Sequence, residues 1–160
     1  MSGKLVLRWV HTPDLPPAPA WPAPAERNIS AQSEPLVQSH IYDRAFRVVG
    51  GGDRVYYGSS SDDAVVCLDG ATGRVLWQHT TEGPVRLAPT LHGGKLYLGS
   101  DDGTMSCLDA ESGRLVWRTR GAPGDRRLSG NGRLISRWPV RAGTIVEDGV
   151  VYFTAGIFPS

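Results

Sequence analysis

An eleven-residue stretch occurs twice in the chain, as CLDGATGRVLW at residues 67–77 and as CLDAESGRLVW at residues 107–117. The two copies begin 40 residues apart. Internal similarity at a fixed period of this length is typical of solenoids, propellers and other arrays, in which each repeat is one supersecondary unit. We therefore take this repeat as the unit from which the fold is built.

Each copy has the features of a β-hairpin. A strand-favouring run leads into a polar turn, at Asp69–Gly73 in the first copy and Asp109–Gly113 in the second, and a second short strand ends on Trp77 or Trp117. The glycine can adopt a positive φ, and the aspartate can accept hydrogen bonds from turn amides. A tryptophan at the same phase of each repeat is a large apolar plate, which we expect to pack against the neighbouring unit.

The two copies resemble the tryptophan-docking repeat of the pyrroloquinoline-quinone-type (PQQ-like) β-propellers, with the pattern A-x-D-x-x-T-G-x-x-x-W. Cysteine stands in the alanine place of both copies, and Ser112 replaces threonine in the second. The matching residues of the structural docking motif are Asp69, Thr72, Gly73, Trp77, Asp109, Gly113 and Trp117. In that superfamily the motif joins one blade to the next, so the resemblance implies a fold and gives these residues a structural role.

The strand pattern predicts an all-β chain, a partial β-propeller of about two and a half four-stranded antiparallel blades with a Pro-rich N-terminal segment. We expect the strands of the first blade at 45–49, 54–59, 64–69 and 74–80, and those of the second at 87–91, 95–100, 104–109 and 114–119. The predicted divisions are 1–9 (last strand of a preceding blade), 10–40 (Pro-rich extended connector), 41–83 (first blade), 84–119 (second blade), 120–140 (Arg-rich loop insertion) and 141–160 (start of a third blade).

The N-terminal 40 residues differ from the repeats. Residues 2–8 resemble 112–118 with Leu7 in the tryptophan place, which suggests that the chain begins inside a propeller and is a fragment. The apolar run at 5–7 is too short for a signal-peptide core. Seven of the 12 prolines lie between residues 12 and 35, around Trp21. This composition favours an extended surface connector over a ligand for a proline-binding module, which stays the alternative.

Arginine is concentrated after the second repeat. Between Arg118 and Arg141 there are seven arginines and one acidic residue, Asp125. Guanidinium groups bind carboxylate, phosphate or sulfate through two parallel hydrogen bonds. One hypothesis is an anion-recognition surface, with the candidate residues Arg120, Arg126, Arg127, Arg133 and Arg137. The other is that the arginines form ion pairs with carboxylates of nearby hairpin loops, namely Asp62, Asp63, Asp101 and Asp102.

Composition excludes several classes of partner and site. A net charge of +1 argues against bulk attraction to nucleic acid, and no apolar run approaches the ~18 residues of a membrane span. Cys67 and Cys107 occupy the same phase of adjacent repeats, too far apart for a disulfide, so we predict reduced thiols buried beside the docking tryptophans. We expect no metal site, because neither the histidines nor the Asp62-Asp63 and Asp101-Asp102 pairs have ligand spacing.

The function expected from this resemblance is that of a binding or protein-interaction scaffold without catalysis of its own and without a cofactor. The superfamily includes periplasmic scaffold lipoproteins of outer-membrane protein assembly, and residues 120–158 resemble planctomycete-type exported repeat proteins. The resemblance therefore implies a periplasmic or otherwise exported parent, with a protein or an anionic glycan as partner. One alternative is part of a quinoprotein oxidoreductase, with PQQ and calcium. Another is a self-assembling module, because bare strand edges favour pairing with a second copy.

Overall fold

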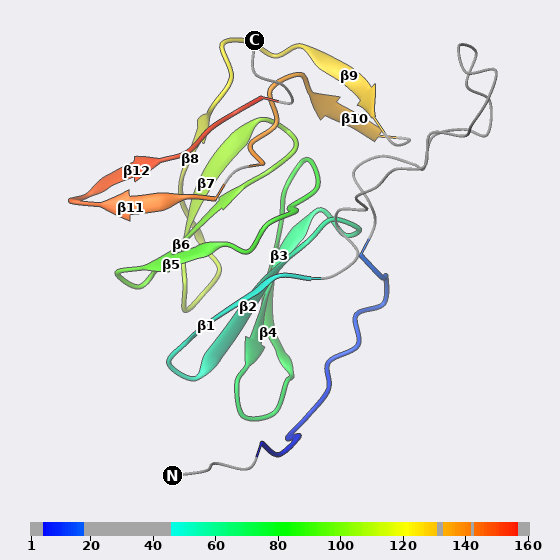
Figure 1. The fold of residues 1–160 in the computed structure, drawn as a ribbon, viewed down its shortest axis with the longest axis vertical. Helices are drawn as coiled ribbons and strands as arrows, with labels where there is room; N and C mark the ends of the chain where they lie inside the picture. Colours follow the sequence, from blue (N-terminus) through cyan, green and yellow to red (C-terminus); the bar gives the residue numbers. More distant parts are fainter. Residues whose placement is uncertain (1–4, 18–45, 131–132, 142, 157–160) are drawn as a thin grey trace, which may run out of the picture.

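The computed structural model describes residues 5–17, 46–130, 133–141 and 143–156, and within these ranges it contains strands and no helix (Figure 1). Two four-stranded antiparallel sheets follow each other along the chain, in the orders β1-β2-β3-β4 and β5-β6-β7-β8. The strands of these sheets are β1 Val48–Gly51, β2 Arg54–Ser59, β3 Ala64–Asp69, β4 Val75–Thr80, β5 Thr90–His92, β6 Lys95–Gly99, β7 Thr104–Asp109 and β8 Leu115–Arg120. The predicted all-β fold of four-stranded blades is confirmed.

Two further hairpins follow the second sheet. They are formed by β9 Arg127–Gly130 with β10 Arg133–Ser136, and by β11 Ile145–Glu147 with β12 Val150–Tyr152. The first strands β1, β5 and β11 are neighbours in space, because β5 contacts both of the others. β11 and β12 therefore stand where the first half of a third blade would stand.

The segment 120–140 is not the irregular loop that its glycines suggested, because it contains the β9–β10 hairpin. The two residues between these strands are Asn131 and Gly132, and Asn-Gly is the pair most favoured in two-residue hairpin turns. This signal was present in the sequence and was outweighed by the number of glycines and arginines around it.

Two predicted strands, the first of each blade, begin three residues later than expected. The first strand of the second blade begins at Thr90 rather than at Leu87, because Pro89 has no N–H to donate. The first strand of the first blade runs to Gly51, which pairs with Arg54 across a turn of two residues, and Gly52 has a φ of 62° there. The Pro-rich segment predicted at 10–40 lies outside the described residues from residue 18 onward.

The repeated turns have the predicted geometry. Asp69 Oδ1 accepts hydrogen bonds from the Thr72 backbone N–H at 2.7 Å and from the Thr72 hydroxyl at 2.7 Å. Asp109 Oδ1 accepts the equivalent pair from Ser112, at 2.8 and 2.6 Å. Gly73 and Gly113 close these turns at φ values of 72° and 71°.

Alternation along the strands gives each blade two apolar faces. Tyr56, Val65 and Cys67 of the first blade pack against β6 and β7 side chains of the second, such as Leu96, in one buried cluster. The opposite face of the second blade, which includes Met105 and Cys107, packs against β11–β12 side chains such as Val151. The core is therefore a series of layers between blades, and each blade depends on its neighbours for burial.

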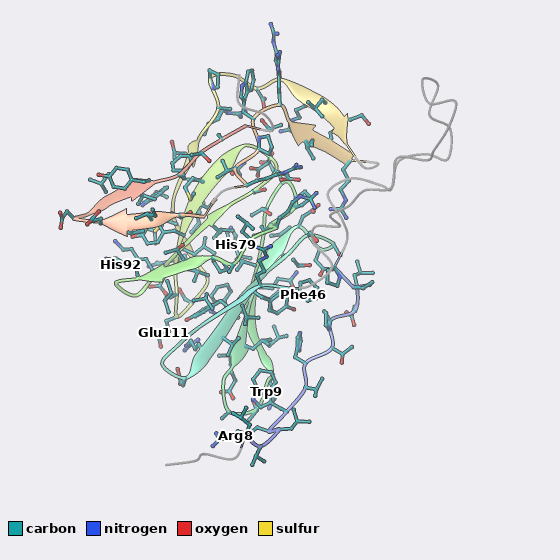
Figure 2. The ribbon with its side chains drawn as sticks, viewed as in Figure 1. Arg8, Trp9, Phe46, His79, His92 and Glu111 are labelled. Atoms are coloured by element: carbon teal, nitrogen blue, oxygen red, sulfur yellow. The ribbon has the colours of Figure 1, made fainter. Side chains whose placement is uncertain are left out.

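The tryptophans join these layers. Trp77, on β4, packs on the turn of the next blade so closely that a Cβ added to Gly113 would lie 2.5 Å from the indole ring. Trp9 packs in the same way on Gly73, again with 2.5 Å to an added Cβ, and its Nε1 donates to the Gly70 carbonyl at 3.0 Å. Figure 2 shows Trp9 beside the loop that connects β3 and β4.

Trp9 corrects the alignment of the N-terminal segment. The sequence placed Leu7 in the tryptophan position, but the Leu7 side chain is 80% exposed and Trp9, two residues later, makes the contact with Gly73. The similarity of residues 2–8 to 112–118 favoured an ungapped match, and a shift of two residues cannot be seen in such a short segment.

Both cysteines are free and buried, as predicted. Each pairs across its hairpin with the tryptophan of its own repeat, Cys67 with Trp77 and Cys107 with Trp117. Burial raises the pKa of both thiols above the ordinary value. The cysteines are therefore small packing residues of the layers between blades.

Candidate functional site

The arginine-rich part of the chain lies at one end of the blades, which we call the connector face. It consists of the loops 60–63 and 100–103, which join the second and third strands of each blade, and of the connections 81–89 and 121–144. In Figure 1 the β9–β10 hairpin lies at this end, away from the turn between β3 and β4.

Asp101 is the most buried charge of the connector face. Its side chain has 0% exposure and faces two guanidinium groups. Arg86 Nε donates to Asp101 Oδ2 at 2.7 Å. Arg141 donates to both oxygens, from Nε to Oδ1 at 2.6 Å and from Nη2 to Oδ2 at 2.7 Å. One carboxylate thus holds the connection before the second blade and the connection after it.

A repeated tripeptide explains why two arginines reach this position. Pro84-Val85-Arg86 and Pro139-Val140-Arg141 stand at equivalent places, because Val85 N–H donates to the Ser59 carbonyl and Val140 N–H to the Ser100 carbonyl. The backbone N–H of Asp101 donates to Pro84, and that of Gly156 donates to Pro139. Gly156 therefore takes the place of Asp101 in the third unit and offers no carboxylate. Arg141 forms its ion pair with Asp101 of the second unit instead.

A second carboxylate, Asp102, organises the loop beside it. Its Oδ1 accepts from the Thr104 backbone N–H at 2.8 Å and from the Thr104 hydroxyl at 2.6 Å. Arg118 Nη2 lies 3.6 Å from Asp102 Oδ2 and donates to Glu82 at 3.0 Å. Arg127 donates to the other oxygen of Glu82 at 3.2 Å. These ion pairs connect β8, the β9–β10 hairpin and the connection between the first two blades.

Arg133 connects the β9–β10 hairpin to the first blade. Its Nη1 donates to Asp63, and its Nη2 donates to the Ser61 carbonyl at 2.8 Å. Burial raises the pKa of the Asp63 carboxyl above its ordinary value, and the nearby Arg133 charge opposes this rise. The contact joins β10 to a loop 70 residues earlier in the chain.

The five candidate anion-binding arginines thus separate into two groups. Three have carboxylate partners: Arg133 with Asp63, Arg127 with Glu82, and Arg120 with Asp125 at 2.5 Å. The other two, Arg126 and Arg137, have no carboxylate partner among the described residues, although the Arg137 guanidinium lies 5.4 Å from the centre of the Trp138 ring. Of the four loop carboxylates considered as partners, Asp63, Asp101 and Asp102 contact arginines, while Asp62 accepts from the Ser59 hydroxyl at 2.7 Å.

Carboxylates of the turns and of the connector face predict a loss of stability in acid. Hydrogen bonds from Thr72 and Ser112 lower the pKa of Asp69 and Asp109, and hydrogen bonds from Arg118 and Arg127 lower that of Glu82. A pKa lowered by folding stabilises the folded chain above the ordinary values, 3.8 for Asp and 4.5 for Glu, and this contribution is lost as the pH falls below them. The raised pKa of Asp63 opposes the effect.

We therefore expect the melting temperature to fall between pH 5 and pH 3, measured by circular dichroism. The Glu82→Gln variant removes one contributing carboxyl and should show a shallower decline over the same interval. Superimposable profiles of the variant and the parent would contradict a role for Glu82.

A concave region lies at the opposite end of the blades, between the β1–β2, β5–β6 and β7–β8 turns. Its volume is about 860 Å³, and its lining includes Tyr56, Leu91, Lys95 and the labelled His92 and Glu111 of Figure 2. Arg54 lines this region and donates to the Glu111 carbonyl at 2.9 Å. Within the described ranges, no group of three or more His, Cys, Asp and Glu side chains is placed to hold a metal ion, and no helix is suited to cross a membrane.

Sequence reasoning named Asp101 as a partner of the loop arginines, which include Arg141, but missed Arg86 as its second partner and the burial of its carboxylate. The available signal was the tripeptide Pro-Val-Arg at 84–86 and 139–141, which recurs at the same 55-residue offset as the strands on either side of the insertion. Sequence reasoning grouped Arg141 with the arginines of the insertion. It therefore did not recognise that Arg141 belongs to the repeated tripeptide and that Arg86 is its counterpart.

Comparisons with known proteins agree with this fold. The family model described as "Outer membrane protein assembly factor BamB" matches residues 21–155. Among solved structures, BamB from Moraxella catarrhalis is 22% identical with a TM-score of 0.55, over 75% of this chain and 36% of that chain. The quinohemoprotein alcohol dehydrogenase ADHIIG from Pseudomonas putida HK5 is 19% identical with a TM-score of 0.57, over 68% of this chain and 16% of that chain.

At these identities, the two structures establish the fold. The chain spans 36% and 16% of the lengths of these two proteins, and a search of curated proteins gave no match. The resemblance to PQQ-like β-propeller repeat proteins is confirmed.

Proposed function

Because the chain belongs to the family described as outer membrane protein assembly factor BamB, we propose that it acts as a propeller scaffold that binds a protein partner and catalyses no reaction itself. The protein is then periplasmic or otherwise exported. In this proposal the blades provide a rigid support, and the β9–β10 hairpin is the element that contacts the partner.

The observation that carries the proposal is an exposed hairpin on a fixed base. The base is held because Ile135 and Ser136 are buried and the Ser136 N–H donates to the Asp101 carbonyl at 2.8 Å. Leu134, between its buried neighbour and Arg133, is nevertheless 64% exposed. Arginines on a rigid support are typical of contact points in protein interfaces, and Leu134 adds an exposed apolar side chain beside them.

Replacing Leu134 with aspartate tests this proposal. We expect the amount of a co-purifying protein, quantified by mass spectrometry, to fall at least ten-fold when the Leu134→Asp variant is purified from its source cells. The reason is that the new charge would be buried in the interface. The matched control is Val75→Asp, which places the same charge on β4 at a side chain that is 51% exposed. Circular dichroism melts establish that both variants fold.

The proposal is wrong if Leu134→Asp retains every partner of the parent, or if the control loses the same partner to the same extent. The first outcome would remove the hairpin from the interface. The second would indicate a general loss of association caused by added charge.

Part of a quinoprotein oxidoreductase is the alternative that the same fold allows, since the ADHIIG chain shares it. The two proposals differ in a direct measurement. Addition of PQQ with Ca²⁺ to the parent protein should leave the visible spectrum equal to the sum of the components if the protein is a scaffold, and should change it if the quinone is bound.

Self-association is favoured by one observation at the β11–β12 hairpin. Ile145, Val150 and Tyr152 are 63%, 48% and 54% exposed, and β12 has one partner strand among the described residues. Apolar side chains beside an unpaired strand edge favour pairing with a second copy. A molar mass that stays monomeric in light scattering as the concentration rises would argue against it.

A further inference from the structure

Arg126 and Arg137 differ from the other arginines of the connector face. Arg86, Arg118, Arg120, Arg127, Arg133 and Arg141 each contact a carboxylate. Arg126 and Arg137 are exposed and have none within the described residues. The difference is local, because Asp125 is adjacent to Arg126 in the chain but contacts Arg120 at 2.5 Å and Arg127 at 3.7 Å.

The two arginines are neighbours across the hairpin. The Arg137 backbone N–H donates to the Arg126 carbonyl at 2.8 Å, which continues by one pair the register in which Arg127 faces Ser136. Residues opposed in an antiparallel pair have Cβ atoms about 4.5–5.5 Å apart, and like charges in such positions repel. A ligand that neutralises both charges would remove this repulsion.

One of the two guanidinium groups is already oriented. The Arg137 guanidinium lies over the Trp138 ring, 5.4 Å from its centre, and the Trp138 backbone N–H donates to the Ser136 hydroxyl at 3.1 Å. A guanidinium stacked on an aromatic face keeps its N–H groups in its plane, free to bind an oxyanion through two parallel hydrogen bonds.

We propose that Arg126 and Arg137 form a binding site for a tetrahedral oxyanion, the sulfate or phosphate group of a ligand. Two guanidinium forks supply enough donors for its oxygens and match the charge of about −1.5 to −2 of a phosphate monoester at neutral pH. The site does not depend on the scaffold proposal, since it rests on the arginine pair and needs no protein partner.

The test is a titration of the full 160-residue chain, followed by NMR of the arginine Nε–Hε groups and backbone amides. The probes are inorganic sulfate and inorganic phosphate, with chloride at the same ionic strength as the reference. We expect saturable shifts at Arg126 and Arg137, and a loss of affinity of at least ten-fold in Arg126→Gln/Arg137→Gln. The Arg126→Lys/Arg137→Lys variant keeps the charges but lacks the planar guanidinium groups. Its affinity should lie between those of the unsubstituted chain and the glutamine variant.

The matched control is Arg74→Gln/Arg114→Gln, which removes two exposed arginines from the turns at the other end of the blades and changes the net charge equally. Its affinity should stay within two-fold of the parent. Glucose 6-phosphate and glucose 6-sulfate then compare the two oxyanions on the same sugar. The ester that binds with the higher affinity identifies the ligand class.

Three results would overturn the proposal. One is a linear response to the probes equal to that of chloride, which is ionic screening alone. Another is equal loss of affinity in the glutamine variant and the control. The third concerns the acidic residues outside the described ranges, Glu26, Glu34 and Asp43. If binding appears only after they are replaced by their amides, the chain's own carboxylates are the ligands of this arginine pair.

Discussion

Replacing Asp101 with alanine is expected to lower the free energy of unfolding by about 3–5 kcal/mol, the usual cost of removing one partner from a buried ion pair. The side chain has 0% exposure, and its partners Arg86 and Arg141 are 7% and 18% exposed. Without the carboxylate, two guanidinium groups would remain in a place that water scarcely reaches. The measurement is urea denaturation of the full chain at pH 7, with the slope checked for two-state behaviour.

The matched control is Asp125→Ala, which removes an aspartate that also contacts two arginines, at a side chain that is 61% exposed. Its effect should be much smaller, because water replaces the lost partner. If Asp101→Ala prevents folding, Arg141→Lys gives a milder form of the test, since it keeps the charge and loses the paired hydrogen bonds. Equal effects of Asp101→Ala and Asp125→Ala would show that burial does not strengthen the Asp101 contacts.

Replacing Gly113 with alanine is expected to destabilise the chain by about 2–5 kcal/mol. The positive φ of 71° costs an alanine roughly 1–2 kcal/mol. Displacement of the Trp77 ring, 2.5 Å from the added Cβ, adds the roughly 1–3 kcal/mol typical of overpacking. The junction between the first and second blades should therefore loosen, which thermal and urea unfolding both report.

Gly94→Ala separates the two contributions. Gly94 has the same φ of 71°, and an added Cβ there meets nothing within 4 Å, so it carries the backbone cost alone. The difference between the variants measures the contact with Trp77. A double-mutant cycle with Trp77→Leu should recover most of that difference. If Gly113→Ala costs no more than Gly94→Ala, the tryptophan contact contributes nothing to the junction.

The repeat determined how much of the fold could be predicted. β2, β3 and β7 begin and end at the predicted residues, because each lies between turn residues that the two copies share. The Asp69 and Asp109 turns followed from side-chain chemistry that acts within five residues. The strand starts at Thr90 and Val48 were predicted three residues too early, since they depend on a proline and on a two-residue turn next to a run of three glycines.

The composition of the candidate site was predictable, and Asp63, Asp101 and Asp102 were among the carboxylates named as partners, but which arginine contacts which carboxylate was not. Arginine content marked residues 118–141, but several of the partners come from loops 36 to 70 residues away, such as Glu82 for Arg118 and Asp63 for Arg133. Contacts at this sequence distance depend on how blades stack, which no local pattern encodes. Trp9 was missed for a related reason, because a single short segment gives no second copy to fix its alignment.

The two tryptophan junctions described above close with different hydrogen bonds. At Gly73, the Trp9 indole N–H donates to the Gly70 carbonyl. At Gly113, the equivalent Ala110 carbonyl accepts from the Tyr56 hydroxyl at 3.1 Å, and the buried Trp77 indole N–H has no hydrogen-bond partner among the described residues. The units of this array are therefore not interchangeable. An array made by copying the first blade would repeat Tyr56 and leave one indole unsatisfied at every interface, so each unit is adapted to the neighbour it has.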